Sequence, residues 1–335
     1  MSILTKFDWR REKVYLFFDE IQKLRGWSSK IKLLYDNFPN LKIVLSGSAS
    51  ILIEREALSN LAGRYFLIKM EPLSLMEFFE LKTGRRVDNP SVWKNDVKLV
   101  FEDYLIKLLP EIVEWSEQPV REYIRSNVVE KVVRKDLPEI FENVNSSLLM
   151  NLLEIFYSEP GTILNLDSLS SNLKVSKKTL IEHINYLENS YLIRVVRNLR
   201  SSLLVVSRKL RKVYPYHWSL IYSLFNREEV ETGKFYECVV ASLLDAKYYW
   251  RDGDKEIDFI IGKLPIEVKA LRKVYDWNLK NLKYVMKKFK MNEGVLVYLG
   301  TEFEEVNWIK VVPFFDICYN PQILGKQDPT STANY

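Results

Sequence analysis

The sequence predicts a multidomain protein of the α/β class, and three observations support this prediction. The chain has 335 residues, enough for about two to three domains of ordinary size. Near the N-terminus, two apolar runs of strand length flank a helical stretch. After residue 213 the pattern becomes helix, three strands, helix and strand. Such alternation of strands and helices is typical of α/β folds.

Two apolar runs near the N-terminus predict parallel strands. Val14–Phe18 is a continuous apolar run of strand length, which fits a parallel strand that is covered on both faces. Leu41–Leu45, apolar except for Lys42, predicts a second strand. Asp19-Glu20 follows the first run, and Ser46-Gly47-Ser48 follows the second. Ligands of open α/β sheets bind at the carboxyl ends of the strands, so we expect a site there.

These polar residues are typical of half of a nucleotide-binding site. In an NTPase the aspartate after such a strand holds Mg²⁺ and the glutamate polarises the attacking water, roles that fit Asp19 and Glu20. Ser48 or Ser46 could sense the terminal phosphate at the end of the second strand. Arg64 could supply positive charge to the transition state. The alternative is a strand whose charged end simply meets water.

Residues 147–212 predict a winged helix. A helix, a helix–turn–helix and then a β-hairpin follow one another, which is the order of elements in that fold. Lys177 and Lys178 begin the candidate recognition helix, and a helix N-terminus carrying lysines can bind a phosphate. Arg197 and Arg200 lie in the predicted wing.

Two basic runs predict contact with DNA. Residues 194–212 contain seven Lys or Arg and no acidic residue, and residues 269–290 contain eight with only Asp276 against them. A surface that neutralises several phosphates gives binding a steep dependence on salt. The alternative to DNA contact is that each basic run forms an ordinary protein face exposed to water.

A carboxylate pair and a lysine form the second candidate site. Residues 257–261 predict one strand that carries Asp258, and a tight turn leads to a strand with Glu267 and Lys269. Residues two apart on a strand share a face, so this hairpin can bring the three side chains together. Two carboxylates can bind Mg²⁺, and Glu237 on the preceding helix could add a third. The alternative is a solvated strand face with a weak ion pair.

Most of the sequence resembles the prokaryotic and archaeal AAA-type ATPases that carry a nuclease-like domain at their C-terminus. The resemblance covers residues 14–300 and is carried by VYLFFDEIQKLRGWSSK, LAGRYFLIKMEPLSLMEFFE, ETGKFYECVVASLL and YYWRDGDKEIDFIIGKLPIEVKALRK. By this resemblance Asp19 and Glu20 are the Walker B pair, Ser48 lies in the sensor segment, and Arg64 is the family's arginine.

The pattern around Asp258, Glu267 and Lys269 resembles the PD-(D/E)xK, restriction-endonuclease-like superfamily. The resemblance implies that Asp258 and Glu267 are metal ligands, Lys269 is the catalytic lysine and Glu237 is an accessory acid. The chain is then expected to begin with an incomplete ATPase core at residues 1–84 and a helical lid at 85–146. A winged helix at 147–212 and a restriction-endonuclease-like α/β domain at 213–324 follow, and a disordered tail at 325–335 ends the chain.

The phosphate-binding loop is the main departure from the ATPase family. Neither GxxxxGKS nor GxxxxGKT occurs in the sequence, and only 13 residues precede Val14, fewer than the roughly 30 that a strand, the loop and a helix require. We therefore expect a truncated P-loop core that does not hydrolyse ATP alone. An apolar face of the first strand should lie open. A P-loop-bearing partner or self-association would complete the site.

These features predict an AAA-family, ATPase-like protein that acts in DNA binding or processing. Its expected partner is DNA, and the resemblance implies Mg²⁺ and ATP as cofactors. One alternative is a Mg²⁺-dependent DNA nuclease that works through the C-terminal domain. The other is a non-catalytic adaptor or accessory subunit that binds DNA or protein.

Overall fold

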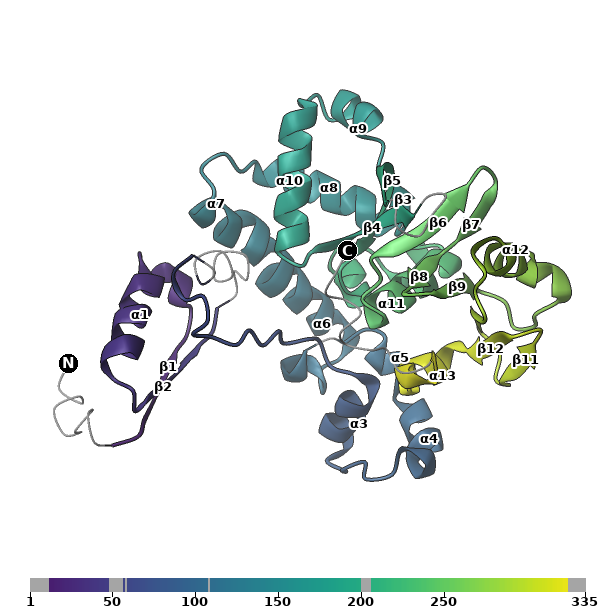
Figure 1. Cartoon of the computed structure of the whole chain (residues 1–335), viewed down its shortest axis with the longest axis horizontal. Coiled ribbons are helices and arrows are strands. Elements are labelled where there is room, and N and C mark those ends of the chain that lie inside the picture. Colours follow the sequence, from purple (N-terminus) through teal and green to yellow (C-terminus); the bar gives the residue numbers. More distant parts are fainter. Residues whose placement is uncertain (1–11, 48–56, 58, 108, 200–205, 325–335) are drawn as a thin grey trace. The chain divides into compact units, whose positions relative to one another are not determined.

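The computed structural model describes residues 12–47, 57, 59–107, 109–199 and 206–324. Ser48, Arg200 and the expected disordered tail at 325–335 lie outside the described residues. The chain divides into two compact units, one from residues 1–70 and 139–142 and one from residues 71–138 and 143–335 (Figure 1).

The smaller unit contains the predicted strand, helix and second strand. β1 (Val14–Phe18) and β2 (Leu41–Leu45) pair in parallel, with Val14 opposite Leu41 and Phe18 opposite Leu45. The helix between them is α1 (Trp27–Asn37). The core of this unit is formed by buried apolar side chains, namely Ile21, Trp27, Ile31, Ala57 and Leu61.

One face of this two-stranded sheet is open. Tyr15 is 56% exposed and Phe17 is 74% exposed, and Val44, which lies opposite Phe17, is 49% exposed. The other residues of β1, namely Val14, Leu16 and Phe18, are half-buried. They point to the opposite face, because successive side chains of a strand alternate between its two faces. This confirms, for the described residues, the expectation that an apolar face of the first strand lies open.

The N-terminal part of the larger unit is helical, as the sequence predicts. Its helices are α3 (Leu75–Thr83), α4 (Pro90–Leu99), α5 (Phe101–Tyr104) and α6 (Glu117–Tyr123), with π-helical segments η4 (Ile124–Glu130) and η5 (Val132–Asp136). The short helix α7 (Leu137–Ile140) begins in this unit and ends in the segment 139–142 that belongs to the smaller one. Ser74 caps α3 by accepting a hydrogen bond from the backbone N–H of Glu77, whose side chain bonds back to Ser74. This reciprocal cap fixes the start of the helix.

The next part contains three helices and a hairpin. The helices are α8 (Ser146–Ser158), α9 (Leu166–Asn172) and α10 (Lys177–Asn189), and the hairpin is formed by β4 (Ile193–Leu199) and β5 (Val206–Pro215). Leu180, Ile184 and Leu187 of α10 are buried, which is the face that their spacing predicts. The short strand β3 (Thr162–Ile163) pairs with β5.

The hairpin belongs to a sheet that continues into the C-terminal part of the chain. The order in this sheet is β3-β5-β4-β6-β7, with β6 (Tyr248–Asp252) parallel to β4 and β7 (Lys255–Ile257) antiparallel to β6. Strands on both sides of residue 212 therefore share one hydrogen-bonded sheet.

A second sheet lies in the C-terminal part. Its order is β11-β12-β10-β9-β8, and its strands are β8 (Phe259–Ile261), β9 (Leu264–Lys269), β10 (Gly294–Tyr298), β11 (Glu304–Val306) and β12 (Ile309–Pro313). The helices of this part are α11 (Thr232–Leu243), α12 (Lys280–Phe289) and α13 (Phe314–Tyr319). One apolar core extends from Leu75 to Leu324 and includes Val239, Phe259 and Val297.

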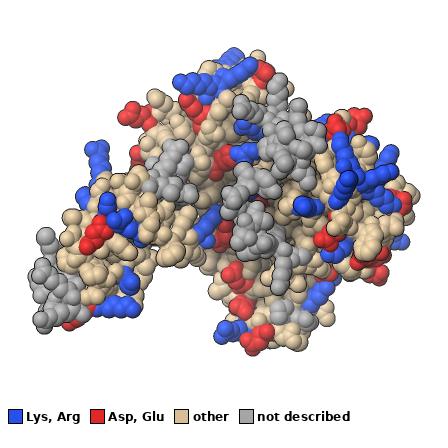
Figure 2. All heavy atoms as spheres, viewed as in Figure 1, with Lys and Arg blue, Asp and Glu red and all other residues tan. Residues whose placement is uncertain are grey.

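The predicted fold class is confirmed as a multidomain α/β protein with several sheets. The P-loop core, winged helix and nuclease-like domain stay predictions. None of the described helices combines the length and apolar character needed to cross a bilayer. Positive and negative side chains are interspersed over the face shown in Figure 2, with Lys and Arg gathered over the position of α12 in Figure 1.

Candidate active site

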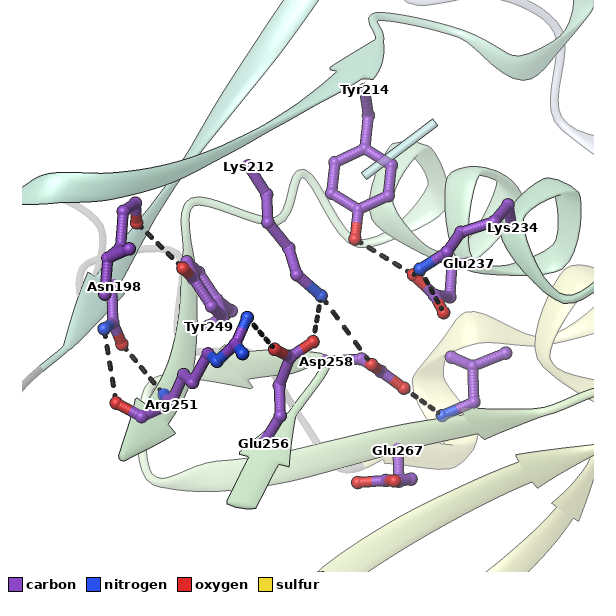
Figure 3. A network of polar contacts seen from close by, with 12 residues as sticks. Asn198, Lys212, Tyr214, Lys234, Glu237, Tyr249, Arg251, Glu256, Asp258 and Glu267 are labelled. Carbon is purple, nitrogen blue, oxygen red and sulfur yellow. Dashed lines mark hydrogen bonds and ion pairs between the residues drawn. The ribbon is translucent and has the colours of Figure 1, made fainter. Parts of the chain in front are cut away.

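A cluster of charged side chains lies where α11, β5, the β7–β8 junction and β9 come together (Figure 3). Four members are residues that the sequence singles out: Glu237 on α11, Asp258 between β7 and β8, and Glu267 and Lys269 on β9. The fifth, Lys212 on β5, was not predicted as a site residue.

Asp258 lies at a break between two strands rather than within one. The sequence predicts a single strand over residues 257–261, but β7 ends at Ile257 in one sheet and β8 begins at Phe259 in the other. The Asp258 carboxylate Oδ2 accepts a hydrogen bond of 2.8 Å from the backbone N–H of Val268. This bond fixes the carboxylate against β9.

Glu267 and Lys269 point to the same side of β9, as the strand alternation predicts. The Lys269 Nζ lies 2.6 Å from the Glu267 Oε1. The other carboxylate oxygen of Glu267, Oε2, is buried and has no hydrogen-bond partner among the residues that the structure describes. Burial, and then the charge of Asp258, raises the pKa of Glu267 to about 8.

Lys269 stays protonated at neutral pH. Burial by itself would lower the pKa of this lysine, but the carboxylates of Glu267 and Asp258 more than offset the effect, so the pKa is raised. A protonated lysine cannot take a proton from water. It can stabilise negative charge that develops on a phosphate.

Glu237 enters the cluster from α11. Its Oε2 accepts a hydrogen bond of 3.2 Å from the Tyr214 hydroxyl, and the Lys234 Nζ lies 3.4 Å away (Figure 3). Burial, and then the charge of Asp258, raises the pKa of Glu237 to about 7. A carboxylate with a pKa near neutrality is suited to exchange protons with a reacting group.

Lys212 brings a buried positive charge into the cluster. Its side chain is 3% exposed, forms an ion pair with Glu256 and lies 4.0 Å from Asp258 (Figure 3). Burial would lower the pKa of Lys212, but the charges of Asp258, Glu237 and Glu256 raise it. The sequence places Lys212 in a basic run expected to contact DNA, and its burial corrects that expectation for this residue.

Asp258 and Glu267 carry the type of ligand that Mg²⁺ uses. The described residues contain no group of three or more His, Cys, Asp or Glu side chains arranged to hold a metal, but Mg²⁺ commonly uses only one or two carboxylates and keeps several waters. Asp258 and Glu267 are such a pair. The buried, unbonded Oε2 of Glu267 is a free ligand oxygen, and an atom of this kind normally has a partner.

The polar residues of the smaller unit do not all come together. Asp19 Oδ1 accepts a hydrogen bond of 2.6 Å from Ser46 Oγ and another of 2.9 Å from the backbone N–H of Glu20. The carboxyl ends of β1 and β2 therefore meet, as predicted. Arg64 instead forms an ion pair of 3.0 Å with Asp36 on α1. Ser48 lies outside the described residues.

The predicted DNA-contacting residues differ in how exposed they are. Lys178 is exposed at the start of α10, next to Lys177, which forms an ion pair with Asp167. Arg197 lies 3.7 Å from Glu188. Arg200 lies outside the described residues.

Comparison with protein families divides the chain into three matched segments. Residues 1–79 match an AAA domain. Residues 99–231 match a domain of unknown function (DUF8612), and residues 232–317 match another (DUF4143). The candidate cluster is supplied mainly by the last segment, although Lys212 comes from the one before it.

Similar proteins are uncharacterized proteins of prokaryotes. One from Haemophilus influenzae is 29% identical over 57% of this chain, which covers 47% of that protein. Two from Methanocaldococcus jannaschii are each 24% identical. The first match spans 90% of this chain and 73% of that relative, and the second spans 54% of this chain and 42% of that relative. The chain thus spans about half the length of two of these three relatives.

No solved structure matches the chain. The similarity to AAA domains covers residues 1–79, about a quarter of the chain.

Proposed function

We propose that this AAA-like protein processes DNA, and that its C-terminal cluster hydrolyses phosphodiester bonds with the help of Mg²⁺. The observation that carries the proposal is that Asp258 is bonded to β9 beside Glu267 and Lys269, while one buried oxygen of Glu267 has no partner within the described part of the chain. Two acidic ligands beside a lysine suit the hydrolysis of a phosphodiester, whose transition state gains negative charge.

Four side chains of the cluster take three roles in this mechanism. Asp258 and Glu267 would hold Mg²⁺, which when bound polarises the phosphate. Lys269, protonated and 2.6 Å from Glu267, donates a hydrogen bond to a phosphate oxygen. Glu237, whose pKa is raised to about 7, accepts a proton from the attacking water.

DNA would be held by basic residues outside the cluster. The helices α8 to α10 and the β4–β5 hairpin have the order expected of a winged helix, and Lys178 is exposed at the start of α10. Lys177, Arg197 and Arg200 complete the proposed contact surface. If about 4 to 6 phosphates are contacted, DNA affinity falls steeply between low and moderate salt.

A cleavage assay tests the nuclease proposal. Wild-type protein with Mg²⁺ should cut DNA, and Lys269→Met should slow cutting by about 100-fold or more, the usual effect of removing a group that stabilises transition-state charge. The matched control is Lys263→Met, which removes an exposed lysine from the β8–β9 turn and should cut like wild type. If both variants cut like wild type, the cluster is not the active site.

The non-catalytic alternative predicts a different result. An adaptor or accessory subunit would bind DNA or protein without cutting, so wild type would be inactive with Mg²⁺ or Mn²⁺ and Lys269→Met would change only local charge. Absence of cutting together with salt-sensitive DNA binding would therefore support the adaptor.

Nucleotide binding by the smaller unit is a second candidate function. It is favoured by the contact between Asp19 and Ser46 at the ends of two parallel strands and by the AAA match. Calorimetric titration with Mg²⁺-ATP tests it. Binding that is lost in Asp19→Ala would support a nucleotide site, and no heat up to millimolar nucleotide would exclude one in this chain by itself.

A further inference from the structure

Two aromatic rings stack on the surface just after β9. The rings of Tyr275 and Trp277 have centroids 4.5 Å apart and lie within 10° of parallel. Tyr275 is 50% exposed and Trp277 is 69% exposed. Large aromatic side chains normally bury most of their area, so an exposed stacked pair presents a flat apolar surface to solvent.

The local backbone holds this pair in place. The backbone N–H of Tyr275 donates to the Asn278 side-chain oxygen at 2.9 Å, and the backbone N–H of Asn278 donates to the Tyr275 carbonyl at 2.9 Å. Asp276 forms an ion pair with Lys283 of α12, and Leu279 is buried. The turn is thus tied to α12, and the rings need little ordering before they bind a ligand.

Exposed basic residues flank the aromatic pair in the sequence. Arg272 and Lys273 precede it and Lys280 and Lys287 follow it; all four are exposed and, within the described part of the chain, have no ion pair. Residues seven apart in a helix share a face and lie about 10 Å apart, so the two helical lysines form a row. Figure 2 shows Lys and Arg gathered over the position that α12 has in Figure 1.

The pair follows the carboxylate cluster closely along the chain. Tyr275 follows Lys269 by six residues, and six residues span at most about 22 Å. The connecting segment is anchored, because the backbone N–H of Leu271 donates to the Lys269 carbonyl and the backbone N–H of Leu299 donates to the Leu271 carbonyl, each at 2.8 Å.

We propose that Tyr275 and Trp277 form a stacking platform for the bases of single-stranded nucleic acid. Aromatic faces next to a row of cations are the usual means of binding single strands without sequence preference, because every base has a flat face and every linkage a phosphate. The proposal deepens the proposed function, since such a platform would lead one strand to the cluster around Lys269. The charge row favours a nucleic acid over an apolar peptide.

Binding without catalysis tests the platform. Fluorescence anisotropy with a labelled 12-nucleotide oligothymidylate, its RNA counterpart and a duplex is measured in EDTA, so that cleavage plays no part. Trp277→Ala should weaken single-strand binding by roughly 5- to 100-fold and duplex binding by less than about 2-fold. Trp277→Phe should retain most of the affinity. Equal affinities for the single-stranded DNA and RNA oligonucleotides would show that the protein contacts bases and phosphates rather than the sugar.

The matched control is Trp308→Ala, which removes a tryptophan that is 72% exposed and belongs to no stacked pair among the described residues. It should bind like wild type. Trp277→Ala binding within about 2-fold of wild type, or losing duplex and single strand equally, would overturn the platform. The nuclease proposal is tested separately from the platform. Lys269→Met is expected to change cleavage, whereas Trp277→Ala is expected to change single-strand binding in EDTA.

Discussion

Lys212 is buried among carboxylates, and this makes it important for stability. Replacing one partner of a buried charge network leaves the other charges uncompensated, which typically costs about 3–5 kcal/mol. We expect Lys212→Met to lower the free energy of unfolding of the larger unit by this amount. Lys247→Met is the control: Lys247 is 48% exposed and lies 3.6 Å from Asp245, so its loss should cost less than about 1 kcal/mol. Chemical denaturation measures both, and equal effects would contradict the assigned role.

The raised pKa of Glu267 predicts a fall in stability with rising pH. The folded protein keeps this proton up to about pH 8, whereas an unfolded glutamate releases it near 4.5. The folded state therefore binds more protons between these values, so its stability decreases as pH rises through them.

Glu267→Gln tests this dependence. The variant cannot ionise at this position, so its unfolding midpoint should fall less than that of wild type between about pH 5 and pH 9. The control is Glu305→Gln, at an exposed position on β11, which should keep the wild-type slope. Parallel curves for wild type and Glu267→Gln would show that Glu267 does not titrate in this range.

The sequence predicts part of the cluster because strand alternation is a local property. Glu267 and Lys269 share a strand, so their common side follows from their spacing. Lys212 comes from β5, and no local pattern shows that β5 passes beside α11 and β9. The sequence does not predict the stacked pair for a similar reason: Tyr275 caps and Trp277 belongs to the 3-10 helix η8 (Asp276–Leu279), which is too short to show a periodic pattern.

At the level of elements, the open face of the β1–β2 sheet makes a clear prediction. Phe17→Thr should change the local opening free energy of β1 and β2 by less than about 0.5 kcal/mol, because exposed side chains contribute little. Ile31→Ala should lower it by about 2–4 kcal/mol, because Ile31 is buried in the core of this unit and its removal leaves a cavity. Hydrogen exchange of the β1 and β2 amides measures both effects. Similar losses would indicate that the face is covered in solution.

Elements with continuous patterns were predicted better than their junctions. The apolar residues of β1 and β2 are enough to locate these strands in the sequence, and the helical spacing of apolar residues is enough to locate α10. The sequence does not reveal the break at Asp258, because residues 257–261 are apolar apart from Asp258 and contain no Gly or Pro that would mark the end of a strand. It arises from tertiary pairing, since β7 bonds to β6 while β8 bonds to β9.

At the level of the whole molecule, the sheet that crosses residue 212 predicts one cooperative body. β4 pairs with β6 in parallel, and Val196 and Tyr214 belong to the same apolar core as Val239. Residues 147–212 and residues 213–324, expressed as separate pieces, should each lack cooperative unfolding, because each loses strand partners and core contacts. Circular dichroism of the two pieces and of the whole chain tests this. Two sharp, independent transitions would contradict it.

The most direct test of the proposed metal-dependent chemistry is a calorimetric titration with Mn²⁺ or Mg²⁺ at about pH 7, in two buffers of different ionisation enthalpy. Because Glu267 has a pKa of about 8, a bound ion should displace about one proton. The account predicts saturable binding of a single ion, a heat that depends on the buffer, and loss of both in Asp258→Asn and Glu267→Gln. No saturable heat up to millimolar metal, or binding that survives in both variants, would contradict it.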